Sequence, residues 1–128
     1  MNSRGSPTLL REMRLFGTGN QTRLLVLIGV LEETYASELA RLAGVNLATV
    51  QNFVKNLELG GVLATRVIGK ERRIGINRRF PARNELKALL AKLAELDPVV
   101  QDGVRRLRKR PRRMGKDIDP DVPDELRR

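Results

Sequence analysis

Hydrophobic positions recur along the chain with the spacing of α-helices, and this pattern predicts most of the elements that we expect. Residues 20–33 are apolar on nearly every side, so they should form a buried central helix, with the Asn20 side chain capping its first turn. Four further segments carry apolar residues at helical spacing, at residues 8–16, 36–43, 47–59 and 82–96. The last of these has a stripe of leucines, and Asp97-Pro98 should end it.

β-Branched residues are concentrated in two neighbouring segments, residues 62–68 and 72–77. The intervening Gly69-Lys70-Glu71 is a hairpin signal, and Ile74 and Ile76 should face the core. The sequence therefore predicts a mainly α-helical protein with a small β-hairpin.

The domain organisation follows from the length of 128 residues, which fits a single domain. We expect a disordered lead-in at 1–7, one domain at 8–97, and a charged, disordered tail at 98–128. Within the tail, residues 105–116 hold eight basic residues and no acid, and residues 117–128 hold five acids and two arginines. Such blocks of like charge resist folding alone. The basic block is interpreted as an extra DNA-binding arm, as an element that binds a partner protein, or as a solvated tail.

The segment from Ala36 to Gly61 has the spacing of two helices joined by a tight turn. Ala40 supplies a small residue where the helices would touch, and Gly44 supplies the positive φ that the turn requires. Asn46 should cap the second helix. One face of that helix is apolar at three- and four-residue spacing and should be buried, through Leu47, Val50, Phe53, Val54 and Leu57.

The opposite face of residues 47–59 is polar. It carries Ala48, Asn52, Lys55 and Asn56, with Thr49 and Gln51 on its flanks. Because Gln and Asn amides can pair with the major-groove edge of adenine, this face is typical of a recognition helix. The alternative is an ordinary helical hairpin with a solvated outer face. Such a face usually mixes Glu and Lys, whereas no acid occurs here before Glu58.

The predicted hairpin and its flanks are strongly basic. Between Arg66 and Arg83 there are seven basic residues and a single acid, Glu71. A hairpin tip that carries Lys70 and Arg72 can reach phosphates or the adjacent minor groove. The alternative is a charged hairpin that only faces solvent.

Composition narrows the chemistry that is available. Lys and Arg total 25 against 15 Asp and Glu, a net charge of +10, which favours a polyanionic partner such as nucleic acid or an anionic membrane surface. The chain has no Cys and no His, which excludes disulfides, thiolate or imidazole metal sites, and Ser–His or Cys–His catalysis. We therefore expect no enzyme activity, no metal and no cofactor.

The longest apolar run, residues 24–31, is shorter than the roughly 20 residues that span a bilayer, and residues 1–5 contain no signal core. We expect a soluble, cytoplasmic protein with no membrane partner.

Residues 9–97 resemble the ArsR/MarR-type winged-helix regulators of bacteria and archaea. The residues that carry the resemblance are SELARLAGVNLATVQNFVKNLELGGVL, the hairpin after them, and INRRFPARNELKALLAKL. The resemblance implies a winged helix-turn-helix fold that binds double-stranded DNA. It implies base contacts from the recognition helix, at Ala48, Thr49, Gln51, Asn52 and Lys55. It implies wing contacts from Lys70, Arg72 and Arg73. Metal sensing is not implied, because the metal-sensing members use Cys or His.

Such proteins bind as twofold dimers on paired half-sites, so we also expect a homodimer. The helical dimer interface would use the leucine stripe, at Leu86, Leu89, Leu90 and Leu93, with Leu9, Leu10 and Met13 beside it. The alternative is that the stripe packs on its own domain. The function expected is that of a sequence-specific DNA-binding transcriptional regulator, a repressor. The alternative function is a winged-helix adaptor or antitoxin whose tail, residues 105–128, binds a second protein.

Overall fold

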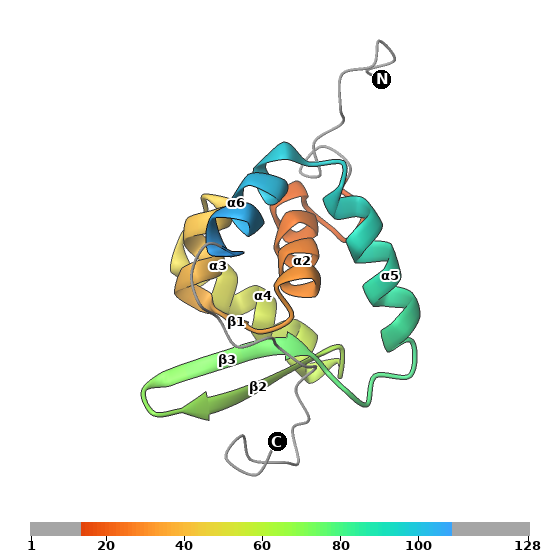
Figure 1. Ribbon diagram of the computed structural model, residues 1–128. Helices are drawn as coiled ribbons and strands as arrows, with labels where there is room; N and C mark the ends of the chain where they lie inside the picture. The colour runs from red at the N-terminus through yellow and green to blue at the C-terminus, as the bar shows by residue number, and fades with distance from the viewer. Residues whose placement is uncertain (1–13, 109–128) are drawn as a thin grey trace.

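The computed structural model of the chain describes residues 14–108, which form five α-helices and a three-stranded antiparallel sheet (Figure 1). The helices are α2 (Gly19–Leu31), α3 (Ala36–Ala43), α4 (Leu47–Leu59), α5 (Arg83–Ala94) and α6 (Pro98–Arg108). The strands are β1 (Thr34–Tyr35), β2 (Leu63–Ile68) and β3 (Glu71–Ile76). The expectation of a mainly helical protein with a small hairpin is confirmed for these residues, and the arrangement is compatible with a winged-helix-like fold.

Helix α2 is the centre of the core, with α5 on one side and α3 and α6 on the other (Figure 1). All residues from Leu24 to Ile28 are buried, as expected for a helix that is apolar on nearly every side. Helix α5 comes especially close at Gly29, where an added Cβ would lie 2.6 Å from the Leu90 Cδ1. The sequence pattern therefore identified the central helix correctly.

The cap of α2 differs from the expectation. Thr18, not Asn20, is the N-cap residue, and Asn20 already lies in the first turn of the helix. The Thr18 hydroxyl accepts a hydrogen bond from the Gln21 N–H at 3.1 Å, and the Gln21 side chain accepts one from the Thr18 N–H at 3.0 Å. This reciprocal pair satisfies two N–H groups at once, which a lone Asn20 side chain could not do.

Helices α3 and α4 and the turn between them have the predicted bounds. Gly44 ends α3 with a φ of 72°, and its N–H donates to the Ala40 carbonyl at 2.9 Å. The Asn46 side chain then accepts from the Thr49 N–H at 2.8 Å and begins α4. Local chemistry fixes this turn, because only glycine adopts that φ without a steric penalty.

The sheet has the order β1-β3-β2, and the hairpin strands pair in register from Leu63 opposite Ile76 to Ile68 opposite Glu71. Ile74 and Ile76 are buried, as predicted. The third strand, β1, was not predicted. Its two residues pair with Ile74 and Arg73 of β3, and two residues are too few to show any periodicity.

The folded domain extends beyond the predicted boundary at residue 97 and includes residues 98–108. They form α6 and do not belong to a disordered tail, because Val100, Val104 and Leu107 are buried against the helical core. A chain cut after Gly103 would lose the last two of these anchors. The spacing of the three residues is helical, but the flanking Pro98 and the dense arginines gave the segment the composition of a solvated tail.

A buried ion pair fixes the corner between α5 and α6. The Arg23 Nε of α2 donates to the Asp97 Oδ2 at 2.8 Å, and both side chains are almost fully buried. The Asp97 Oδ1 also accepts from the Val99 N–H at 2.9 Å, which caps the start of α6. Asp97 therefore caps the start of α6 and ties the turn between α5 and α6 to the centre of the core.

The leucine stripe of α5 also requires a correction. Leu90 and Leu93 are buried in the core of their own chain, and Leu86 packs against that core. Only Leu89 remains 42% exposed. The expectation that Leu90 and Leu93 form a dimer interface is wrong, because both side chains are already buried in the core of their own chain.

Residues 1–13 and 109–128 lie outside the described part of the chain. The expectations for the lead-in at 1–7, for Leu9, Leu10 and Met13, and for the tail beyond α6 therefore concern residues that are not described. Of the helix expected at 8–16, the described residues 14–16 are not helical.

Candidate nucleic-acid interface

The predicted outer face of α4 is exposed. We define the α4 face as its six exposed polar and small residues, which are Ala48, Thr49, Gln51, Asn52, Lys55 and Asn56. Val50, Phe53 and Val54 on the opposite side are buried, and Leu57 is partly buried against the core. The first residue, Leu47, was expected inside but is 44% exposed, because it has helical neighbours on only one side. Apart from Leu47, the helical spacing divided α4 correctly.

The three basic residues predicted to act from the hairpin have different surroundings. Lys70 lies at the exposed tip between β2 and β3, and Arg72 is exposed on β3. Arg73 is half-buried on the other face of β3, where its guanidinium pairs with Glu33 at 3.2 Å and with Glu71 at 3.1 Å. Lys70 and Arg72 are thus open to a ligand, and Arg73 is held by two carboxylates.

The electrostatic surroundings of Arg73 strengthen this difference. Partial burial lowers the pKa of the Arg73 guanidinium, but the hydrogen bond to Glu71 and the charges of Glu33 and Glu71 outweigh burial and raise that pKa. Glu33 lies just beyond Glu32, the C-cap residue of α2, so the ion pair ties the hairpin to the segment that follows the central helix. The expected phosphate contact from Arg73 is therefore better described as an anchor of the hairpin to the core.

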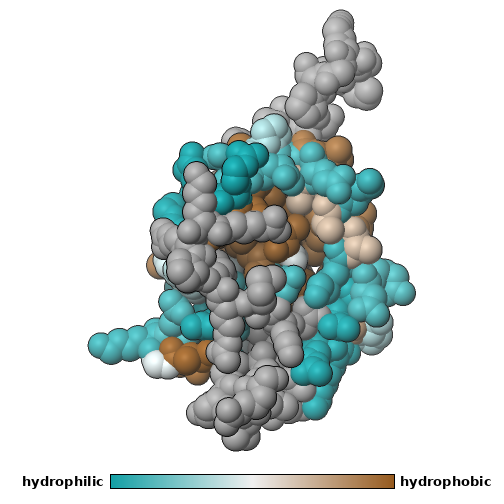
Figure 2. All heavy atoms as spheres, viewed as in Figure 1, coloured by the Kyte–Doolittle hydropathy of each residue, from teal (hydrophilic) through white to brown (hydrophobic). Residues whose placement is uncertain are grey.

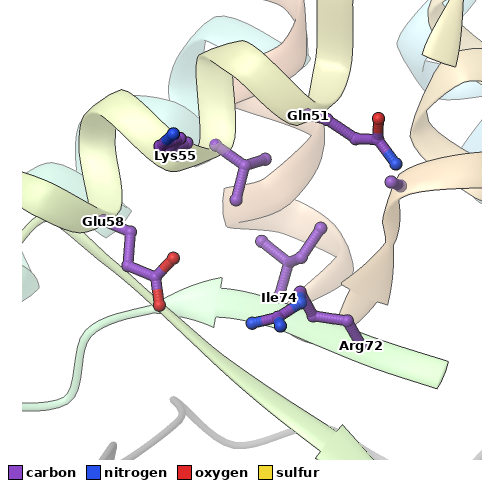
Figure 3. A pocket seen from close by; sticks show the side chains of 7 residues that line it. Gln51, Lys55, Glu58, Arg72 and Ile74 are labelled. Atoms are coloured by element: carbon purple, nitrogen blue, oxygen red, sulfur yellow. The ribbon is translucent and has the colours of Figure 1, made fainter. Parts of the chain in front are cut away.

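Helix α4 and the hairpin enclose a groove of about 430 Å³, which we call the α4–hairpin groove (Figure 3). Its lining residues come from α3, α4 and β3, and they are Ala36, Gln51, Val54, Lys55, Glu58, Arg72 and Ile74. Val54 and Ile74 form an apolar floor, and charged and amide side chains form the rim. The groove brings together Gln51, Lys55 and Arg72, which were predicted separately as base-reading and phosphate-binding residues.

Two hydrogen bonds connect Glu58 and Arg72, both of which line this groove, through Thr65 of β2. The Arg72 Nη1 donates to the Thr65 Oγ1 at 2.9 Å, and the Thr65 hydroxyl donates to the Glu58 Oε2 at 2.7 Å. The sequence pattern gave no indication of this Glu58–Thr65–Arg72 chain, because the three residues lie on three different elements. Their contact depends on how β2 and β3 pair and on how α4 packs against them.

Where the side of the hairpin tip is visible in Figure 2, hydrophilic residues lie beside a small apolar spot. Val67, on β2, is 56% exposed. Among the described residues, no group of three or more acidic, Cys or His side chains could hold a metal ion. None of the helices within residues 14–108 has the length and apolar character needed to cross a membrane.

Comparisons of the chain with protein-family models, with curated proteins and with solved structures gave no match.

Proposed function

We propose that the chain is a winged-helix protein that binds double-stranded DNA sequence-specifically and represses transcription. The observation that carries this proposal is the α4 face, an exposed, amide-rich helix surface beside a basic hairpin. Its six residues include three amides and one cation, and none is acidic. A surface of this kind suits the major groove, where amides can pair with base edges.

In the proposed complex α4 enters the major groove and the β2–β3 hairpin is the wing. Gln51 and Asn52 read bases, with Thr49 and Ala48 beside them at the start of the helix. Lys55, Lys70 and Arg72 contact phosphates, which orient the protein on the duplex without reading sequence. Arg73 supports the wing through Glu33 and Glu71 and does not contact DNA. Occupation of a promoter by such a complex excludes the transcription machinery, which is the basis for proposing repression.

A homodimer remains part of the proposal, with a revised interface. Three large apolar side chains stay exposed along α5 and around the turn into α6, and they are Leu89, Leu96 and Val99, each between 41% and 43% exposed. A second copy could cover these three residues together, in place of the stripe that the sequence indicated. Twofold symmetry would then present two α4 faces to two half-sites.

Recognition can be separated from stability by two substitutions on the α4 face. A preferred site is first selected from random duplex DNA, and binding is then measured by fluorescence anisotropy. Gln51→Ala and Asn52→Ala should each cost about 1–3 kcal/mol on that site and reduce the discrimination against other sequences. Neither should change the free energy of unfolding by more than about 0.5 kcal/mol, because both side chains are exposed.

The matched control is Asn20→Ala, which removes the same amide from an exposed position in the first turn of α2. It should leave DNA affinity unchanged.

The affinity of the unaltered protein should also fall by about 10³-fold or more between roughly 50 and 200 mM salt, if a dimer neutralises six to ten phosphates. Full discrimination in both α4 variants, or no binding to any duplex, would contradict the proposal.

A further inference from the structure

The Glu58–Thr65–Arg72 chain joins the last turns of α4 to both strands of the hairpin. Thr65 lies opposite Ile74 in the β2–β3 register, so Arg72 is its diagonal neighbour on the same face of the sheet. That face borders the α4–hairpin groove, where Glu58 and Arg72 both line the rim (Figure 3). The Thr65 hydroxyl thus bridges the Glu58 carboxylate of α4 and the Arg72 guanidinium of β3.

The chemistry of the link is directional. A threonine hydroxyl has a single proton, and this proton is donated to the Glu58 Oε2 at 2.7 Å. The lone pairs of the Thr65 oxygen are therefore left for the Arg72 Nη1 at 2.9 Å. The Glu58 charge polarises the hydroxyl and strengthens its bond to the guanidinium. The remaining N–H donors of Arg72 are still available for a phosphate oxygen.

The exposure of Glu58 and Arg72 indicates that the two hydrogen bonds contribute more in a DNA complex than in the free protein. Glu58 and Arg72 are exposed in the free protein, so water competes for both hydrogen bonds and each adds little to folding stability. A duplex seated over α4 and the hairpin would exclude that water and lower the local dielectric constant, which strengthens the same bonds. An arginine that is already ordered also loses less conformational entropy when it takes a phosphate.

We propose that Glu58 and Thr65 are positioning residues, which hold Arg72 over the α4–hairpin groove so that α4 and the hairpin meet DNA as one rigid unit. The inference rests on the proposed DNA-binding function and deepens it. Glu58 acts here through Thr65 and not through contact with a base. The Arg72 side chain is ordered in the free protein, so DNA binding costs less conformational entropy.

The first measurement needs no DNA. The mobility of the Arg72 Nε–Hε group is measured by its heteronuclear NOE in the full chain and in three variants. Thr65→Val removes the hydroxyl and keeps the shape, Thr65→Ser keeps the hydroxyl, and Glu58→Ala removes the carboxylate. Arg72 should be ordered in the unaltered chain and in Thr65→Ser, and mobile in Thr65→Val and Glu58→Ala. Equal mobility in all four proteins would overturn the proposal.

The second measurement is DNA affinity on the selected site. Thr65→Val should bind about 2- to 10-fold more weakly, which is the cost of ordering one long side chain, and Thr65→Ser should restore the affinity. The salt slope should stay the same in both, because the Arg72 charge is retained.

The outcomes distinguish this proposal from the proposed function. If the unaltered chain binds DNA and Thr65→Val binds equally well, the positioning role is wrong and the function stands. If the unaltered chain binds no duplex, the function is wrong and the positioning role is wrong with it. Thr65→Val is also compared with Thr65→Ser in thermal stability. If only Thr65→Val is destabilised, and this loss of stability accounts for the whole change in affinity, then Thr65 has a structural role and the proposal is overturned.

Discussion

Helices α4 and α5 are almost equal in length, at 13 and 12 residues, and each buries one side against the rest of the chain. Their exposed sides differ. The exposed side of α4 presents three amides and one cation, with a single acid, Glu58, near its C-terminal end. By contrast, α5 and the turn after it present charges of both signs throughout, among them the pair of Lys92 and Glu95 at 3.6 Å. Mixed charges are the usual surface of a solvated helix. Helix α5 therefore serves as an internal reference, against which the α4 face stands out as a surface suited to a polyanion.

The comparison also concerns what holds each region in place. Helices α5 and α6 are fixed by buried side chains and by the Arg23–Asp97 ion pair. The α4–hairpin region also has buried side chains, among them Val54 and Ile74, but its rim is held by exposed hydrogen bonds and by the Arg73 ion pairs. We expect substitutions of buried residues in either region to change stability, and substitutions of the exposed rim residues to change binding.

The largest effect is expected at Asp97. Asp97→Ala leaves the Arg23 guanidinium buried without its carboxylate and removes the acceptor for the Val99 N–H. The free energy of unfolding, measured with urea, should fall by about 3–5 kcal/mol. The matched control is Asp102→Ala on α6, where the exposed carboxylate pairs with Arg105 and Arg106 and the loss should stay below about 1 kcal/mol. Equal losses in both variants would contradict the importance of the buried pair.

Two adjacent leucines of α5 should behave differently. Leu90→Ala should cost about 2–5 kcal/mol of unfolding free energy, because Leu90 is fully buried against α2. Leu89→Glu should leave stability within about 1 kcal/mol, because Leu89 is 42% exposed. If the proposed dimer uses Leu89, the same variant should raise the dimer dissociation constant by about tenfold or more in sedimentation experiments. An unchanged dimer would move the interface away from α5.

The smallest effect separates the adjacent arginines Arg72 and Arg73 of β3. Arg72→Ala should reduce the slope of log affinity against log salt by about 0.9, the value for one lost phosphate contact. Arg73→Ala should leave that slope unchanged and lower stability by about 1 kcal/mol or less, through loss of its contacts with Glu33 and Glu71. Equal slopes for the two variants would show that the two arginines do not differ in their contact with DNA.

The elements that the sequence predicted well are those fixed by local chemistry. Gly44 and Asn46 set the turn between α3 and α4 through their own backbone and side chain, and the spacing of α4 identified its exposed face. The bounds of the hairpin followed from its β-branched residues and from Gly69. None of these features depends on a distant part of the chain.

The features that the sequence did not predict all depend on tertiary contacts. Helix α6 folds because α2 and α3 cover its apolar side. The sequence did not indicate this, because the proline and the arginines give the segment the composition of a solvated tail. Spacing indicated that Leu89, Leu90 and Leu93 lie near one another but not that the core of the same chain buries Leu90 and Leu93. The different surroundings of Arg72 and Arg73 depend on Glu33, 40 residues away in the chain. The roles of these residues in DNA binding stay predictions.

The close approach of α2 and α5 has a consequence for how this sequence can change during evolution. At Gly29 an added Cβ would lie 2.6 Å from the Leu90 Cδ1 and 2.9 Å from the Leu90 Cβ, which is closer than carbon atoms can pack. A side chain at position 29 therefore requires Leu90 to shift or a smaller residue at position 90. A substitution at position 29 alone should destabilise the packing of α2 against α5, and a smaller residue at position 90 alone should leave a cavity. Positions 29 and 90 should covary among descendants of this chain, whereas the exposed residues of the α4 face are under no such packing constraint.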